Sequence, residues 1–116
     1  VTVASDTLAL TINEAGTVTG LVYDGVEFIQ YPWRFNVGYN GTSYFDGTQY
    51  SNEDANVLTR QDISSGTFHG HKITVDMGPD LRLERVIGFY DGDEYAVVAN
   101  RMTNISATDL TYVGAG

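Results

Sequence analysis

Apolar and polar residues alternate along much of this chain, which is the pattern of strands with one buried face. The clearest example is Leu8, Leu10 and Ile12, which alternate with threonine and alanine. No window repeats its apolar residues with the roughly 3.6-residue period of a helix. Short strand candidates, separated by turns rich in Gly, Asp and Asn, therefore predict an all-β fold, an antiparallel two-sheet β-sandwich of about nine strands.

The expected strands are Val1–Ala4, Thr7–Asn13, Thr17–Tyr23, Val26–Gln30, Arg34–Tyr39, Ala55–Arg60, Phe68–Met77 and the two strands of a hairpin between Leu81 and Asn104. The first four are expected to form an antiparallel meander. Pro32 removes a ladder hydrogen bond, so the chain there is expected at the edge or start of a strand. The stretch from Tyr44 to Glu53 is expected to be a loop or a short hairpin.

The hairpin is the most informative element, because Asp91-Gly92 between two apolar runs is a strong turn signal. Pairing Tyr90 with Tyr95 also places Glu84 opposite Arg101, which is a favourable cross-strand pair. One face is then expected to be core, and it carries Leu81, Leu83, Ile87, Phe89, Ala96, Val98 and Met102. Arg85 and Asn100 interrupt that face, while the second face carries tyrosines and paired charges.

Composition limits the function classes. The 116 residues predict a single sandwich domain, and the absence of cysteine excludes disulfides and thiolate sites. A formal net charge of −9 argues against nucleic acid and anionic membranes as partners, and no apolar run is long enough for a membrane helix.

We expect a module or fragment of a larger protein, with further domains as possible partners. Abundant Gly, Thr, Asn, Asp and Tyr with little Lys favours a secreted or cell-surface protein of bacterial type.

The central segment holds the best candidate site, because aromatic rings there alternate with amides and carboxylates. Sugars present flat C–H faces rimmed by hydroxyl groups, so a protein that binds them needs both kinds of side chain. The candidate ligand-binding residues are Tyr31, Trp33, Tyr39, Asn40, Tyr44, Asp46 and Gln49. An alternative stays open, in which aromatic residues such as Phe28, Trp33 and Phe35 fill the core.

Metal sites are less well supported. The acidic turns Asp91–Glu94 and Asn52–Asp54 suggest calcium as a cofactor, but neither completes a known calcium loop, and solvated turns are the favoured interpretation. His69 and His71 share one side of a strand and would need a third ligand to hold a transition metal. The alternative is a pair of partly exposed histidines, so no metal or cofactor is assigned.

Nothing in the chain marks catalysis, because nucleophile, zinc-protease and phosphate-loop motifs are absent and fifteen acidic residues give no way to choose a catalytic pair. We therefore assign no catalytic residue. An enzyme acting on sugars is a third interpretation, and it would require a cleft with two carboxylates.

The order of elements resembles the β-supersandwich domains of carbohydrate-active enzymes, namely the galactose-mutarotase-like group and the amino-terminal sandwich domains of glycoside hydrolases. The similar parts are Leu8 to Val22, a strand, a glycine turn and a returning strand, and the stretch from Arg85 to Asn104, about half the chain in all. The mutarotase catalytic histidines and glutamate have no match here. The resemblance implies a carbohydrate context, with a non-catalytic module for poly- or oligosaccharides as the leading hypothesis and a structural or interaction domain as the alternative.

Overall fold

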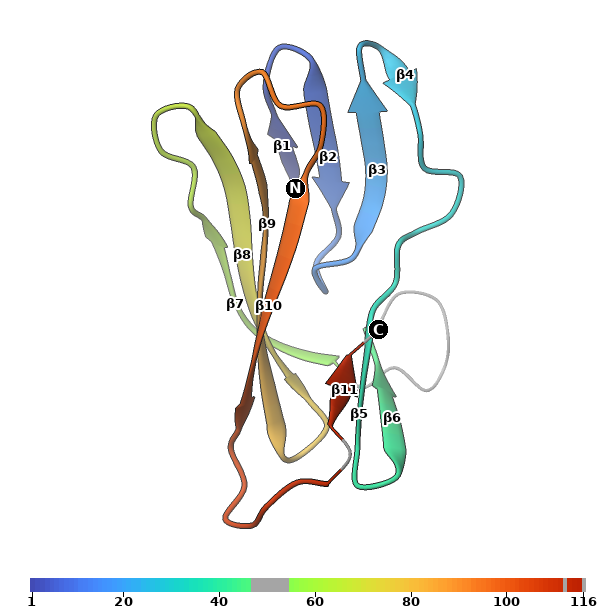
Figure 1. Cartoon of the computed structure of the whole chain (residues 1–116), viewed down its shortest axis with the longest axis vertical. Coiled ribbons are helices and arrows are strands. Elements are labelled where there is room, and N and C mark those ends of the chain that lie inside the picture. Colours follow the sequence, from blue (N-terminus) through green and yellow to red (C-terminus); the bar gives the residue numbers. More distant parts are fainter. Residues whose placement is uncertain (47–54, 112, 116) are drawn as a thin grey trace.

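A computed structural model describes residues 1–46, 55–111 and 113–115, and all their regular structure is β-strand (Figure 1). The strands are β1 (Thr2–Ala4), β2 (Leu8–Ile12), β3 (Val18–Tyr23), β4 (Val26–Glu27), β5 (Asn36–Tyr39), β6 (Thr42–Phe45), β7 (Ala55–Asp62), β8 (Phe68–Met77), β9 (Leu81–Tyr90), β10 (Val97–Asn104) and β11 (Gly114–Ala115). Within the described residues, no helix has the length and apolar character needed to cross a membrane.

The strands form three antiparallel sheets. The long sheet has the order β10-β9-β8-β7, the upper sheet β1-β2-β3-β4 and the lower sheet β11-β5-β6. Figure 1 shows the upper and lower sheets one above the other beside the long sheet. The all-β antiparallel prediction is confirmed, whereas the described strands lie in three sheets rather than two.

The break between the upper and lower sheets follows from the sequence around Pro32. The predicted strand Val26–Gln30 shortens to the two residues of β4, and the chain then continues along the edge of β3. The Phe28 N–H donates to the Leu21 carbonyl and the Trp33 N–H to the Val18 carbonyl, each at 2.8 Å. Proline has no N–H to continue such a ladder, and the lower sheet starts only at Asn36.

The predicted hairpin register is confirmed. Val98 lies opposite Ile87, Asn100 opposite Arg85, and Arg101 opposite Glu84. Every residue of β10 is nevertheless exposed, and this strand forms one edge of the long sheet. The expectation that Val98 and Met102 belong to the core is therefore wrong, since these side chains are 38% and 41% exposed.

Two hydrophobic clusters fill the space between the long sheet and the two shorter ones. The upper core contains Val3, Leu8, Leu10, Ile12, Val18, Ile29, Ile87 and Phe89. The lower core contains Phe35, Val37, Tyr39, Ile73, Val75, Met77, Leu81 and Leu83. Along β9 the two cores are separated by one inward-facing residue, Arg85, which is buried.

Candidate functional site

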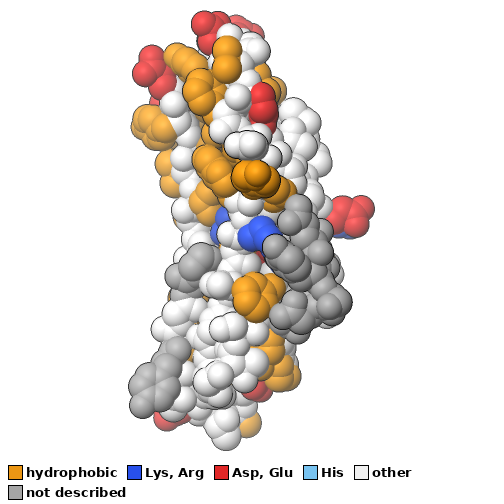
Figure 2. Space-filling view, turned by 90° about the vertical axis from the view of Figure 1, so that its right-hand side faces the viewer, with side chains coloured by type: hydrophobic (Ala, Val, Ile, Leu, Met, Phe, Trp, Pro, Cys, Tyr) orange, Lys and Arg blue, Asp and Glu red, His pale blue; other side chains and the backbone are white. Residues whose placement is uncertain are grey.

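Three large aromatic side chains remain exposed on the stretch that connects β4 to β5. Phe28 is 63% exposed, Tyr31 72% and Trp33 52%. The two backbone hydrogen bonds to β3 tie this stretch to the upper sheet at Phe28 and at Trp33. Figure 2 views the side of the domain where this stretch lies, and hydrophobic side chains gather along it. We call Phe28, Tyr31 and Trp33 the aromatic platform.

This exposure decides between the two interpretations of the platform residues. Phe35 is buried in the lower core, as the core interpretation expects. Phe28 and Trp33 are more than half exposed, so they do not fill the core. Large rings in solvent have no packing role of their own, which is why such surfaces indicate contact with a ligand or a partner.

Two other candidate residues, Tyr39 and Tyr44, lie in and against the lower core. Tyr39 is 1% exposed, and its ring stacks on that of Tyr44 with centroids 4.8 Å apart. The Tyr39 hydroxyl donates to the Met77 carbonyl at 2.9 Å and accepts the Asp80 N–H at 3.1 Å. Burial raises the pKa of the Tyr39 hydroxyl. These rings anchor the β5–β6 hairpin on the long sheet.

Asn40 occupies the β5–β6 turn, where it adopts a positive φ of 50°. Its side-chain oxygen accepts hydrogen bonds from the Thr111 N–H at 2.9 Å and the Thr111 hydroxyl at 3.1 Å. The amide therefore holds the C-terminal segment onto the turn. Of the remaining candidates, Gln49 lies outside the described residues.

Asp46 is fully buried where the upper and lower sheets meet. Its carboxylate accepts hydrogen bonds from the Thr17 hydroxyl, from Arg34 Nε at 2.7 Å and from the Phe35 N–H at 3.3 Å. Arg34 Nη2 lies 2.7 Å from Asp46 Oδ1. A carboxylate held this way positions the start of β5 rather than projecting toward a ligand.

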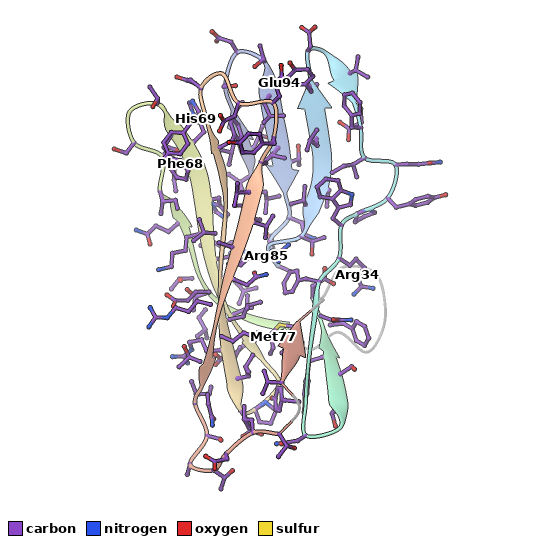
Figure 3. The ribbon with its side chains drawn as sticks, in the orientation of Figure 1. Arg34, Phe68, His69, Met77, Arg85 and Glu94 are labelled. Atoms are coloured by element: carbon purple, nitrogen blue, oxygen red, sulfur yellow. The ribbon has the colours of Figure 1, made fainter. Side chains whose placement is uncertain are left out.

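Arg85 extends from the long sheet toward the same region between the upper and lower sheets. Figure 3 shows Arg85 and Arg34 at about the same height in the domain. Its Nε donates to the Gly16 carbonyl and its Nη1 to the Asn100 side-chain oxygen, both at 3.1 Å. The guanidinium also lies 4.5 Å from the centre of the Phe35 ring. Burial lowers the pKa of Arg85, and the negative charge of Asp46 opposes that shift. We call Thr17, Arg34, Asp46 and Arg85 the junction cluster.

The two histidines share one side of β8, as predicted, and it is the side that carries the buried Ile73, Val75 and Met77. His69 Nε2 lies 2.6 Å from Asp91 Oδ1. His71 is buried, and its Nε2 has no hydrogen-bond partner among the described residues. Burial, followed by the nearby N-terminal ammonium, lowers the pKa of His71.

His71 predicts a pH dependence of stability. A histidine with a lowered folded-state pKa is neutral in the fold, so its contribution is complete above the ordinary histidine pKa of about 6.5. The free energy of unfolding should then fall as the pH drops below about 6.5, by at most about 1.4 kcal/mol per pH unit. Urea unfolding between pH 7.5 and 5 measures the slope. His71→Phe should flatten it; identical profiles for the wild type and His71→Phe would contradict the prediction.

The acidic turn Asp91–Glu94 shows protein partners for each carboxylate. Asp91 pairs with His69, Asp93 Oδ2 accepts the Tyr90 N–H at 2.9 Å, and Glu94 accepts the Tyr23 hydroxyl at 3.3 Å. Among the described residues, no group of three or more His, Asp or Glu side chains is placed to hold a metal ion. The second acidic turn, Asn52–Asp54, lies outside the described residues.

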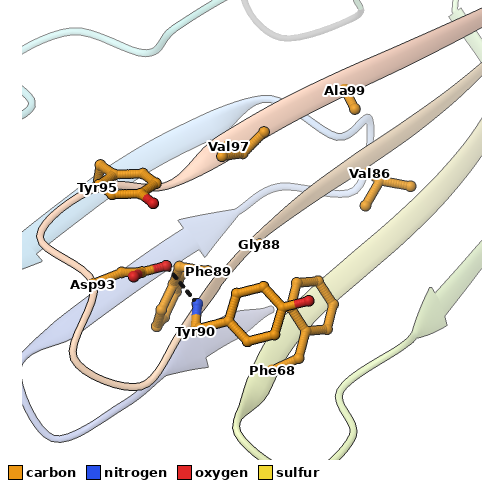
Figure 4. A pocket seen from close by; sticks show the side chains of 9 residues that line it. All are labelled: Phe68, Val86, Gly88, Phe89, Tyr90, Asp93, Tyr95, Val97 and Ala99. Atoms are coloured by element: carbon orange, nitrogen blue, oxygen red, sulfur yellow. Dashed lines mark hydrogen bonds between the residues drawn. The ribbon is translucent and has the colours of Figure 1, made fainter.

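A group of aromatic side chains on the outer face of the long sheet was only partly predicted from the sequence. The prediction placed Tyr90 and Tyr95 on the second face of the hairpin, but it missed Phe68, whose ring lies 5.0 Å from that of Tyr90. A pair of glycines was the signal in the sequence that could have indicated the position of Phe68. Gly70 and Gly88 lie opposite each other on β8 and β9 and leave room for its ring. Figure 4 shows a hollow that Phe68, Gly88, Tyr90 and Tyr95 help to line.

Comparison with protein-family models, with curated proteins and with solved structures finds no match to this chain.

Proposed function

We propose that this protein is a non-catalytic carbohydrate-binding module whose ligand stacks on the aromatic platform. The observation that carries the proposal is the exposure of Tyr31 and Trp33 on a stretch held to β3 by backbone hydrogen bonds. A ring fixed at its backbone loses less conformational freedom on binding than a ring on a free loop. The C–H face of a sugar ring matches such a surface.

The charge of the chain narrows the ligand class. A formal net charge of −9 disfavours anionic polymers such as uronic-acid polysaccharides. We therefore propose a neutral poly- or oligosaccharide as the ligand. In this arrangement Tyr39, Asn40, Tyr44 and Asp46 support the fold around the platform, and Tyr31 and Trp33 make the contact.

The wider setting belongs to the same proposal. Both shorter sheets pack their apolar residues on the long sheet, which supports a β-sandwich whose second layer is divided in two. The resemblance to β-supersandwich domains and the surface composition support a secreted or cell-surface setting in a larger carbohydrate-active protein.

Affinity electrophoresis in gels containing neutral polysaccharides, preceded by a glycan-array screen, tests the function. We expect the wild type to be retarded by at least one neutral glucan, mannan, galactan or xylan. Tyr31→Ala and Trp33→Ala should each abolish most of that retardation, because stacking on one ring contributes about 0.5–1.5 kcal/mol and two rings act together. Both changes remove exposed side chains and keep the backbone bonds to β3, so folding should persist.

The matched control is Tyr90→Ala, which removes an exposed ring from the long sheet. Its retardation should equal that of the wild type. No retardation by any glycan would contradict the proposed function, and so would equal retardation of the wild type and both platform variants.

A second candidate is an interaction domain, and the observation that favours it is the exposure of β10. This edge strand has eight residues with no bulge against β9, and Arg101 is its one charged residue. Natural edge strands of this kind are usually covered or interrupted. A partner domain of the parent protein would cover it, and in that case the glycan screen would be negative.

A further inference from the structure

The outer face of the long sheet carries a hollow of about 250 Å³ beside the β9–β10 turn. We call it the hairpin groove. Its lining residues are Phe68, Val86, Gly88, Phe89, Tyr90, Asp93, Tyr95, Val97 and Ala99. Figure 4 shows Tyr95 on one side, with Tyr90 and Phe68 together on the other. The groove therefore has aromatic rings on two sides.

Two opposed glycines, Gly70 and Gly88, let the Phe68 ring lie close against the sheet. A Cβ at Gly88 would lie 2.6 Å from the Phe68 ring and 2.8 Å from the His69 carbonyl oxygen. A Cβ at Gly70 would lie 2.4 Å from the same ring. The Phe68 ring thus lies directly over the glycine backbones. The Tyr90 ring meets it at 56° with centroids 5.0 Å apart, so the two rings form a corner.

The charged side chain that lines the groove is acidic. Asp93 is its one carboxylate, and none of the described side chains that line it is cationic. The cations of the same face are paired with acids: Lys72 and Arg101 flank Glu84 at 3.0 and 3.8 Å, and Arg82 Nε lies 2.8 Å from Asp76 Oδ1. Arg101 lies four residues along β10 from Val97, about 13 Å away at the usual strand rise.

Aromatic faces with an adjacent carboxylate attract organic cations, because the negative face of each ring and the acid act on the same charge. The volume of about 250 Å³ is below the roughly 300–1,000 Å³ of pockets for larger molecules. A small head group fits this space better than a whole sugar or nucleotide. The net charge of −9 also raises the local concentration of cations.

From these observations we propose that the hairpin groove binds an alkylammonium group between Tyr95 and the Phe68–Tyr90 corner, with Asp93 as the counter-charge. This site is separate from the aromatic platform, which lies along β3 of the upper sheet.

The test is an NMR titration of the ¹⁵N-labelled full chain at 0.15 M NaCl. Choline is compared with its uncharged isostere 3,3-dimethylbutan-1-ol and with butylammonium, which stands for a lysine side chain. We expect the Gly88 and Gly92 amide signals to shift with choline or butylammonium in a saturable way, with a Kd on the order of 1 mM. The stronger of the two cations identifies the source as a quaternary ammonium compound or a lysine.

Three variants sharpen the result. Tyr90→Leu, Tyr95→Leu and Asp93→Asn should each raise the Kd by about two- to five-fold, the effect of one exposed cation–π contact or charge. Trp33→Ala should leave it unchanged. Equal binding of the neutral isostere, unchanged Kd values in the three groove variants, or no saturable shift with either cation would overturn the proposal.

Discussion

Replacing Asp46 with asparagine is expected to lower the free energy of unfolding by about 3–5 kcal/mol, the usual cost of breaking a buried ion pair from one side. The carboxylate is fully buried and is contacted by Thr17, Arg34 and the Phe35 N–H. The groups that face this position are all hydrogen-bond donors, so the amide nitrogen of an asparagine would either face another donor or remain without a partner. Urea unfolding followed by far-UV circular dichroism measures the loss.

Glu14→Gln is the matched control, because it also removes one negative charge but from a side chain that is 93% exposed. Its unfolding midpoint should stay at the wild-type value. If Asp46→Asn instead keeps wild-type stability and loses glycan retardation, the carboxylate contacts the ligand and its structural role is wrong.

Replacing Arg85 with methionine should cost about 2–4 kcal/mol, because it leaves the buried Gly16 carbonyl without its donor and removes a positive charge near Asp46. Methionine keeps an apolar stem of similar length, so the loss does not arise from a large cavity. Arg85→Lys should fall between the wild type and methionine, since lysine keeps the charge but lacks the planar group that lies over Phe35. Equal stability of all three proteins would contradict the role of the guanidinium.

The two sites should also be coupled. The double variant Asp46→Asn, Arg85→Met should lose less than the sum of the single variants, by at least about 0.5 kcal/mol, because each single change leaves a buried opposite charge behind. Strict additivity would show that Asp46 and Arg85 stabilise the fold independently.

The hairpin could be predicted from sequence because several local signals agree. The Asp91-Gly92 turn and the Glu84–Arg101 pair both select the same register, which the structure confirms. Alternation also predicted the buried side of β2 and β9. The exposure of β10 could not be predicted in this way, since alternation shows that two faces differ but not whether another sheet covers them.

Arg85, the charged residue on the predicted apolar face of the hairpin, also could not be explained from the sequence. A charged residue on an apolar face looks like an error of register until the opposing layer is known. In the structure it lies between two separate cores and bonds to Gly16, which is 69 residues away along the chain. Such long-range partners leave no local pattern in the sequence.

The candidate site was predicted as one cluster and the structure divides it. Closeness along the chain brought Trp33, Tyr39 and Asp46 together in the prediction, whereas Tyr39 and Asp46 are buried and Trp33 is exposed. The chain passes from the edge of the upper sheet to the middle of the lower sheet within a few residues. Residues on either side of that passage therefore belong to different environments.

The fluorescence of Trp33 tests the central claim most directly, because this is the only tryptophan in the chain. An exposed indole that stacks on sugar should emit like tryptophan in water and shift to shorter wavelength, saturably, when the glycan found by the screen is added. Tyr31→Ala should weaken that response, and Tyr90→Ala should not. Emission that is already at short wavelength and does not change with any glycan would contradict the account.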